Sequence, residues 1–84
     1  MENEVSVFIG VVTEEKVKTA QIIESIMPIS GVNKVWELTG AYDLLVLVKS
    51  HSIKQINTTL ELIRACYGVT ETSTYLVLSQ HDQK

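Results

Sequence analysis

Several residue types and motifs are scarce or absent in the 84-residue sequence, and each absence excludes a class of protein. Its one cysteine, Cys66, excludes a disulfide framework, a Cys-x-x-Cys motif and a metal site built from cysteines. No apolar run is long enough to span a bilayer, and no basic segment precedes an apolar one at the start. Neither histidine has metal-ligand neighbours at the usual spacing. We therefore expect a cytoplasmic protein without membrane contact, metal or cofactor.

Basic residues are also scarce. Seven Lys and Arg residues face ten Asp and Glu residues, which gives a net charge of −3, and the basic residues are scattered along the chain. Neutralising nucleic-acid phosphates requires clustered Lys and Arg side chains. We therefore expect no direct contact with nucleic acid. A P-loop, a Gly-x-Gly-x-x-Gly motif and a nucleophile elbow are absent as well.

The length allows one domain, residues 1–84, with 45% apolar residues. A domain of this size buries roughly 60% of the surface of its unfolded chain, so association with a partner adds needed stability. Apolar alternation predicts a first strand from Val5 to Val12, apolar on both faces. Thr13 is placed to cap a helix, and Glu14 and Glu15 suit its first turn. Its apolar stripe ends before Pro28 and consists of Val17, Ala20, Ile22, Ile23, Ile26 and Met27.

The second half of the chain repeats this order. Strands are predicted at Val32–Thr39 and Tyr42–Lys49, and the latter is apolar on both faces, so both faces must be covered. A Ser-x-x-Gln capping box starts a second helix at Ser52, and Gly68 is placed as its C′ residue. A last strand is expected at Val69–Ser79. The stripe of the second helix consists of Ile53, Ile56, Leu60, Ile63 and Tyr67.

The order βαββαβ predicts an α+β, ferredoxin-like fold with a four-stranded antiparallel sheet of order 4-1-3-2, since each βαβ half needs a right-handed crossover. This order places the two strands that are apolar on both faces at the centre. Two helices cover only one face of the sheet. An apolar set such as Phe8, Val12, Leu45 and Leu47 then points to the other face. We expect a dimer that packs sheet against sheet, as in a dimeric α/β barrel.

Asp43 is the one carboxylate in an otherwise apolar strand, and it follows a turn at Gly40. It is a candidate general base or ligand anchor, or a turn residue whose carboxylate accepts hydrogen bonds from backbone amides. His51 precedes a helix and suits solvation or local capping better than catalysis. The hydroxyl row from Thr70 to Thr74 indicates either an edge strand or a surface for a small polar ligand.

Two segments carry a resemblance to a known family. Residues 35–43, Val-Trp-Glu-Leu-Thr-Gly-Ala-Tyr-Asp, resemble the Gly-x-Tyr/Phe-Asp hairpin of the Lrp/AsnC effector-binding domain, called RAM. Residues 68–78 resemble the Pro-Gly-Val-x-x-Thr-x-Thr strand that closes that domain. The resemblance covers essentially the whole chain. It implies a ferredoxin-like domain that dimerises through its sheets, assembles further into rings of dimers, and binds an amino acid at the contacts between dimers.

The same resemblance implies an effector site and partners. The chain leaves no room for the helix-turn-helix domain of full-length regulators, so it resembles the stand-alone RAM form, which can act through full-length relatives. Ala41 departs from the family pattern, where an acidic or polar residue is frequent. The positions that match the effector-binding motifs are Gly40, Ala41, Tyr42, Asp43, Thr72 and Thr74.

The sequence thus favours a non-enzymatic domain that senses a free amino acid as a homo-oligomer and modulates transcription. The alternative is a small cofactor-free monooxygenase or isomerase on the same dimeric scaffold. Such an enzyme would depend on His51 and Asp43. A third reading is a purely structural oligomer with an empty site.

Overall fold

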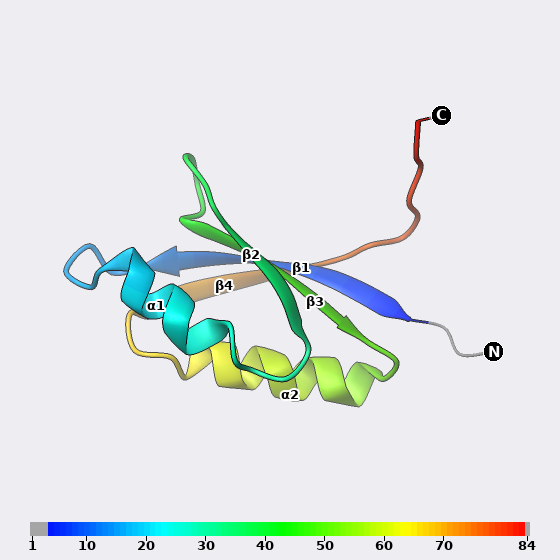
Figure 1. Cartoon of the computed structure of the whole chain (residues 1–84), viewed down its shortest axis with the longest axis horizontal. Coiled ribbons are helices and arrows are strands. Elements are labelled where there is room, and N and C mark those ends of the chain that lie inside the picture. Colours follow the sequence, from blue (N-terminus) through cyan, green and yellow to red (C-terminus); the bar gives the residue numbers. More distant parts are fainter. Residues whose placement is uncertain (1–3, 84) are drawn as a thin grey trace.

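The computed structural model describes residues 4–83 and confirms the predicted βαββαβ order (Figure 1). The strands form one antiparallel sheet of order β2-β3-β1-β4, which is the predicted order read from the opposite edge. The elements are β1 (Val5–Thr13), α1 (Thr19–Ile26), β2 (Val32–Glu37), β3 (Leu44–Ser50), α2 (Ile53–Arg64) and β4 (Val69–Leu76). Neither helix in the described range has the length and apolarity that crossing a bilayer requires.

Both helices lie on the same face of the sheet, and the core fills the space between the two layers (Figure 1). Alternate residues of the central strands β1 and β3 supply the sheet side of this core, because successive side chains of a strand point to opposite faces. The helices supply residues at helical spacing. The buried core consists of Val7, Ile9, Val11, Val17, Ile22, Ile26, Leu44, Val46, Val48, Ile56 and Ile63.

The first helix begins later than the sequence predicts. Thr13 does not cap it but is the last residue of β1, where it pairs with Val69. Its backbone N–H donates to the Asp43 carboxylate at 2.8 Å, so the strand conformation extends through this residue. α1 starts at Thr19 after Lys18, which makes no side-chain cap, and its first turn contains no acidic residue.

The second helix starts as predicted. The Ser52 hydroxyl accepts a hydrogen bond from the Gln55 N–H at 3.2 Å, as an N-cap residue should. The predicted stripe is correct in its centre and wrong at its ends, because Ile53 is 59% exposed and Tyr67 is 78% exposed. Thr59, which the apolar pattern passes over, is instead buried.

Gly68 is not the C′ residue of α2, because that helix ends at Arg64 with Ala65 as its C-cap. Gly68 lies in the turn before β4, with φ at +94°. A Cβ atom at this position would lie 2.8 Å from Cδ1 of Ile22. The glycine is therefore required by both the backbone conformation and the close approach of α1.

The hairpin between β2 and β3 is wider than predicted. The strands were expected to reach Thr39 and to resume at Tyr42, but β2 ends at Glu37 and β3 starts at Leu44. Gly40 has φ at +133°, which the loop needs and which suits glycine. The last strand also ends earlier, at Leu76 rather than Ser79.

The sheet face opposite the helices is apolar and aromatic, as predicted. Register places Phe8 beside Leu47 and Gly10 beside Leu45, out of phase with the core residues of the same strands. The Phe8 and Trp36 rings pack at 6.2 Å between centroids. Trp36 remains 40% exposed. We refer to the residues Phe8, Val12, Trp36, Leu45, Leu47 and Tyr75 as the open face.

Candidate functional site

Asp43 holds the β2–β3 loop against the end of β1. Its backbone N–H donates to the Val11 carbonyl at 2.9 Å, and its carbonyl accepts from the Leu38 N–H at 3.0 Å. Its carboxylate oxygen Oδ2 accepts from the Thr13 N–H at 2.8 Å. Of the roles that the sequence leaves open, the structure therefore displays the carboxylate as an acceptor for a backbone amide.

Tyr42 lies across the middle of β1. A Cβ atom added at Gly10 would approach three atoms of the Tyr42 ring at 2.8–2.9 Å, so the ring packs directly on the glycine. The Tyr42 and Tyr75 hydroxyls are 2.5 Å apart, and the two rings meet edge to face at 6.3 Å. The loop is thus anchored to β4 as well as to β1.

These hydroxyl contacts alter the acidity of both tyrosines. Hydrogen bonding from Ser73, and then from Tyr75, lowers the pKa of Tyr42, while partial desolvation and the Glu71 charge oppose this effect. The hydrogen bond to Tyr42 raises the pKa of Tyr75. The Tyr42 phenolate is therefore the better stabilised of the two, because two hydroxyl groups can donate to it.

The remaining predicted site residues lie elsewhere. Gly40 and Ala41 are exposed in the loop. Thr72 pairs with Val11 and Thr74 with Ile9, so both threonines belong to the helix-side alternation of β4. Tyr42 lies over Gly10 on the opposite face of the sheet. The single chain therefore brings Tyr42 to Ser73 and Tyr75, but not to Thr72 and Thr74.

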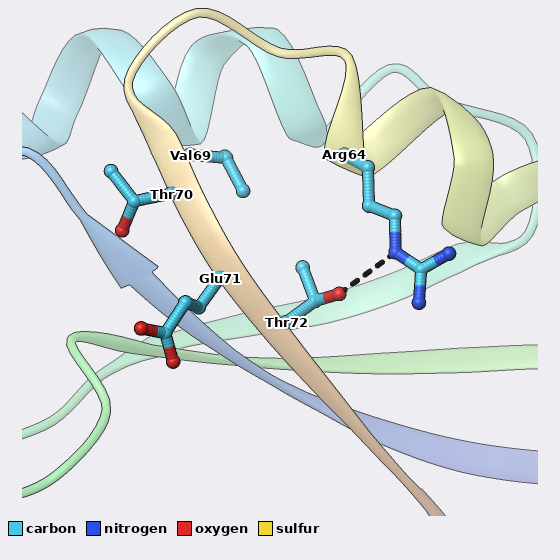
Figure 2. A pocket seen from close by; sticks show the side chains of 5 residues that line it. All are labelled: Arg64, Val69, Thr70, Glu71 and Thr72. Carbon is cyan, nitrogen blue, oxygen red and sulfur yellow. Dashed lines mark hydrogen bonds between the residues drawn. The ribbon is translucent and has the colours of Figure 1, made fainter.

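A pocket of about 370 Å³ lies at the β4 edge, between this strand and the end of α2 (Figure 2). It is lined by Arg64 and by residues 69–72. The Arg64 Nε donates to the Thr72 hydroxyl at 3.0 Å. The Thr70 hydroxyl donates to the Val12 carbonyl at 3.0 Å. The sequence indicated Thr72 but not Arg64, although a basic residue in the last turn before a Thr-rich strand was a usable signal.

The histidine and carboxylate of the enzymatic alternative do not converge. Asp43 precedes β3 and His51 follows it, so an extended strand separates them by roughly 25 Å. The Cys66 thiol is also an unsuitable nucleophile, because burial raises its pKa. Within residues 4–83, no three His, Cys, Asp or Glu side chains come together in a group that could hold a metal ion.

Comparisons with solved structures agree with the fold. FFRP-DM1 is 28% identical with a TM-score of 0.78, and the match covers 88% of this chain and 99% of that one. The hypothetical protein PHS023 from Pyrococcus horikoshii is also 28% identical, with a TM-score of 0.77 and 92% and 93% of the two chains covered. Escherichia coli AsnC has the same fold at 21% identity, with a TM-score of 0.84 over 95% of this chain and 54% of AsnC.

Sequence comparison gives the family. The HTH-type transcriptional regulator LysM of Sulfurisphaera tokodaii is 38% identical over 78 residues, which are 93% of this chain and 56% of the regulator. The homocitrate synthase of Saccharolobus islandicus is 35% identical over 77 residues, which are 92% of this chain and 17% of the enzyme. The chain thus spans about half the length of the regulator. Residues 6–84 match the model of the Lrp/AsnC ligand binding domain, and the chain belongs to this family.

Proposed function

We propose that this chain is an amino-acid-sensing oligomerisation domain without catalytic activity of its own. The observation that carries the proposal is the placement of the same domain in its relatives. Nearly the whole chain matches about half of a transcriptional regulator and 17% of an enzyme, homocitrate synthase. A module joined to two such different proteins suits the sensing of a small ligand better than one particular reaction. The fold also occurs in two regulators solved with L-methionine.

The open face supports the assembly in this proposal. Trp36 and Tyr75 are 40% and 50% exposed, and Phe8 and Leu45 are only partly covered. An aromatic and aliphatic surface of this kind on a small domain is stabilised by burial against a partner. The geometry suits a second copy packed sheet against sheet, which gives a dimeric α/β barrel. Rings of dimers and mixed assemblies with full-length Lrp/AsnC regulators extend the same proposal, and such partners imply a cytoplasmic location.

The effector site in this proposal uses more than one copy of the chain. The loop residue Tyr42 and the β4 threonines Thr72 and Thr74 lie on opposite sides of the sheet. One copy can therefore present its loop to an effector that also contacts the threonines of another copy. Asp43 contributes in this arrangement by fixing the loop through the Thr13 amide.

The enzymatic alternative receives less support from the geometry. A cofactor-free monooxygenase or isomerase needs an acid or base that points into a cleft. Asp43 is hydrogen-bonded to the Thr13 amide, and His51 lies at the far end of β3. A purely structural oligomer remains the simpler alternative, and ligand binding distinguishes the two.

The test is a thermal-shift panel of the free L-amino acids combined with light scattering. A ligand that binds only the native state raises its stability, so the effector should raise the melting temperature. The chain should be at least a dimer at micromolar concentration. Leu47→Glu should weaken assembly, whereas Leu62→Glu should not, because Leu62 is 49% exposed on α2. A monomer at every concentration, with no shift from any amino acid, would overturn the proposal.

A further inference from the structure

The Arg64 side chain is held in place but only partly used. It is the last residue of α2, and its Nε donates to Thr72 Oγ1 at 3.0 Å (Figure 2). A guanidinium group carries five N–H donors, four of them on the two terminal nitrogens. Figure 2 shows these two terminal nitrogens pointing away from Thr72, toward the outside of the strand. They are therefore placed to meet a ligand.

An acidic side chain lines the same pocket without neutralising Arg64. Glu71 precedes Thr72 on β4, and successive strand residues point to opposite faces. In Figure 2, Glu71 and Thr70 lie on one side of the β4 ribbon, and Thr72 and Arg64 lie on the other. The charge of Glu71 also raises the pKa of Tyr42, which places this carboxylate within electrostatic reach of the β2–β3 loop. Glu71 thus lines the pocket of about 370 Å³ from the side of β4 opposite Arg64, and the guanidinium group is left as the cationic group of this pocket.

This arrangement suits a small ligand that carries a carboxylate. A guanidinium group binds a carboxylate through two parallel N–H···O bonds. The pocket is at the lower end of the size range of small-molecule sites, which suits a ligand of a few heavy atoms. Hydroxyl groups of Thr70 and Thr72 add polar contacts at the same edge.

We propose that Arg64 binds the α-carboxylate of the amino-acid effector. This inference rests on the proposed function and assigns the carboxylate contact of that site.

A merely structural role for Arg64 makes a different prediction. A cation in the last turn of a helix interacts favourably with the helix dipole, and the bond to Thr72 adds to this. Loss of such a role lowers the melting temperature of the free protein but leaves its affinity for ligands unchanged. Affinity is therefore the decisive measurement, with the melting temperature as its control.

The experiment compares Arg64→Gln with Lys54→Gln by titration calorimetry. Both variants lose one positive charge from α2, but Lys54 lies ten positions away, about 15 Å along the helix. The ligands are the L-amino acid with the largest thermal shift and its amide, which lacks the carboxylate. We expect Arg64→Gln to weaken binding of the amino acid about ten- to a hundredfold and Lys54→Gln to leave it unchanged. Wild type should prefer the acid to the amide, and Arg64→Gln should lose this preference.

One further variant tests the guanidinium geometry. Arg64→Lys keeps the charge but loses the planar fork, so it should also bind the amino acid more weakly than wild type. Equal affinity of wild type and Arg64→Gln for a bound amino acid overturns the Arg64 inference and leaves the proposed function standing. Failure of wild type to bind any amino acid overturns both.

Discussion

Thr59 allows the sharpest test of how the helix layer is joined to the sheet. The side chain is only 1% exposed, and its hydroxyl donates to the Ser30 carbonyl at 2.6 Å, with the Gln55 carbonyl at 3.1 Å. The turn wraps closely around it, since a Cβ atom at Gly31 would lie 2.8 Å from the Thr59 hydroxyl. This one hydroxyl therefore ties α2 to the start of β2.

The substitution Thr59→Val keeps the shape of the side chain and removes the donor. A hydrogen bond that is lost while its partner stays buried costs about 1–3 kcal/mol. For a domain of this size, each 1 kcal/mol lowers the melting temperature by roughly 4–8 °C. We therefore expect Thr59→Val to melt at least about 4 °C below wild type, at a fixed protomer concentration.

Thr58→Val is the matched control. Its hydroxyl also donates to a carbonyl in the same helix, that of Lys54, but the side chain is exposed. Thr58→Val and Thr59→Val are the same substitution at neighbouring helix positions, so the change in helix propensity is the same in both variants. We expect it to change stability by no more than about 0.5 kcal/mol. Equal melting temperatures for the two variants would refute the role assigned to the buried hydroxyl.

Three further predictions concern the β2–β3 loop. Asp43→Ala should lower the free energy of unfolding by about 1.5 kcal/mol, the lower end for a hydrogen bond to a charged acceptor, because the site is partly exposed. Asp43→Asn should lower it less, because the amide oxygen still accepts the Thr13 N–H. Equal denaturant midpoints for the two variants would contradict this. Ser73→Ala should raise the pKa of Tyr42, because the Ser73 hydroxyl makes the main hydrogen bond that lowers this pKa. A tyrosinate absorbance titration that is unchanged by the substitution would be inconsistent with that bond. Gly10→Ala should displace the Tyr42 ring and lower the free energy of unfolding. In a Tyr42→Ala background the same substitution should lower it much less. Stability losses that simply add in the double variant would argue against direct packing.

Periodicity in the sequence predicted the elements because burial imposes it. The central strands alternate between the core and the open face, and Ile56 and Ile63 sit on the buried side of α2. The start of α1 was wrong because Thr13 has a competing partner. Its amide meets a carboxylate thirty positions away, and no local pattern reveals such a contact. The ends of the α2 stripe were wrong for another reason. The helix ends at Arg64, so Tyr67 lies beyond it, and Ile53 is its first residue.

The candidate site was visible in the sequence only in part. Family motifs indicated the β2–β3 loop and the β4 threonines. The packing of Tyr42 on Gly10 depends on the β1–β3 and β1–β4 registers, which a single sequence does not specify. The pocket at Arg64 depends on where α2 ends relative to β4, and element ends are the least predictable feature of a sequence.

Titration calorimetry of the free L-amino acids against the purified chain tests most directly whether this domain senses an amino acid. Saturable binding of one amino acid, or of a few similar ones, is the predicted result, with a Kd of about 1 mM or lower. Light scattering on the same sample should show an assembled chain. An assembled chain that gives no saturable binding with any L-amino acid would contradict the proposed function.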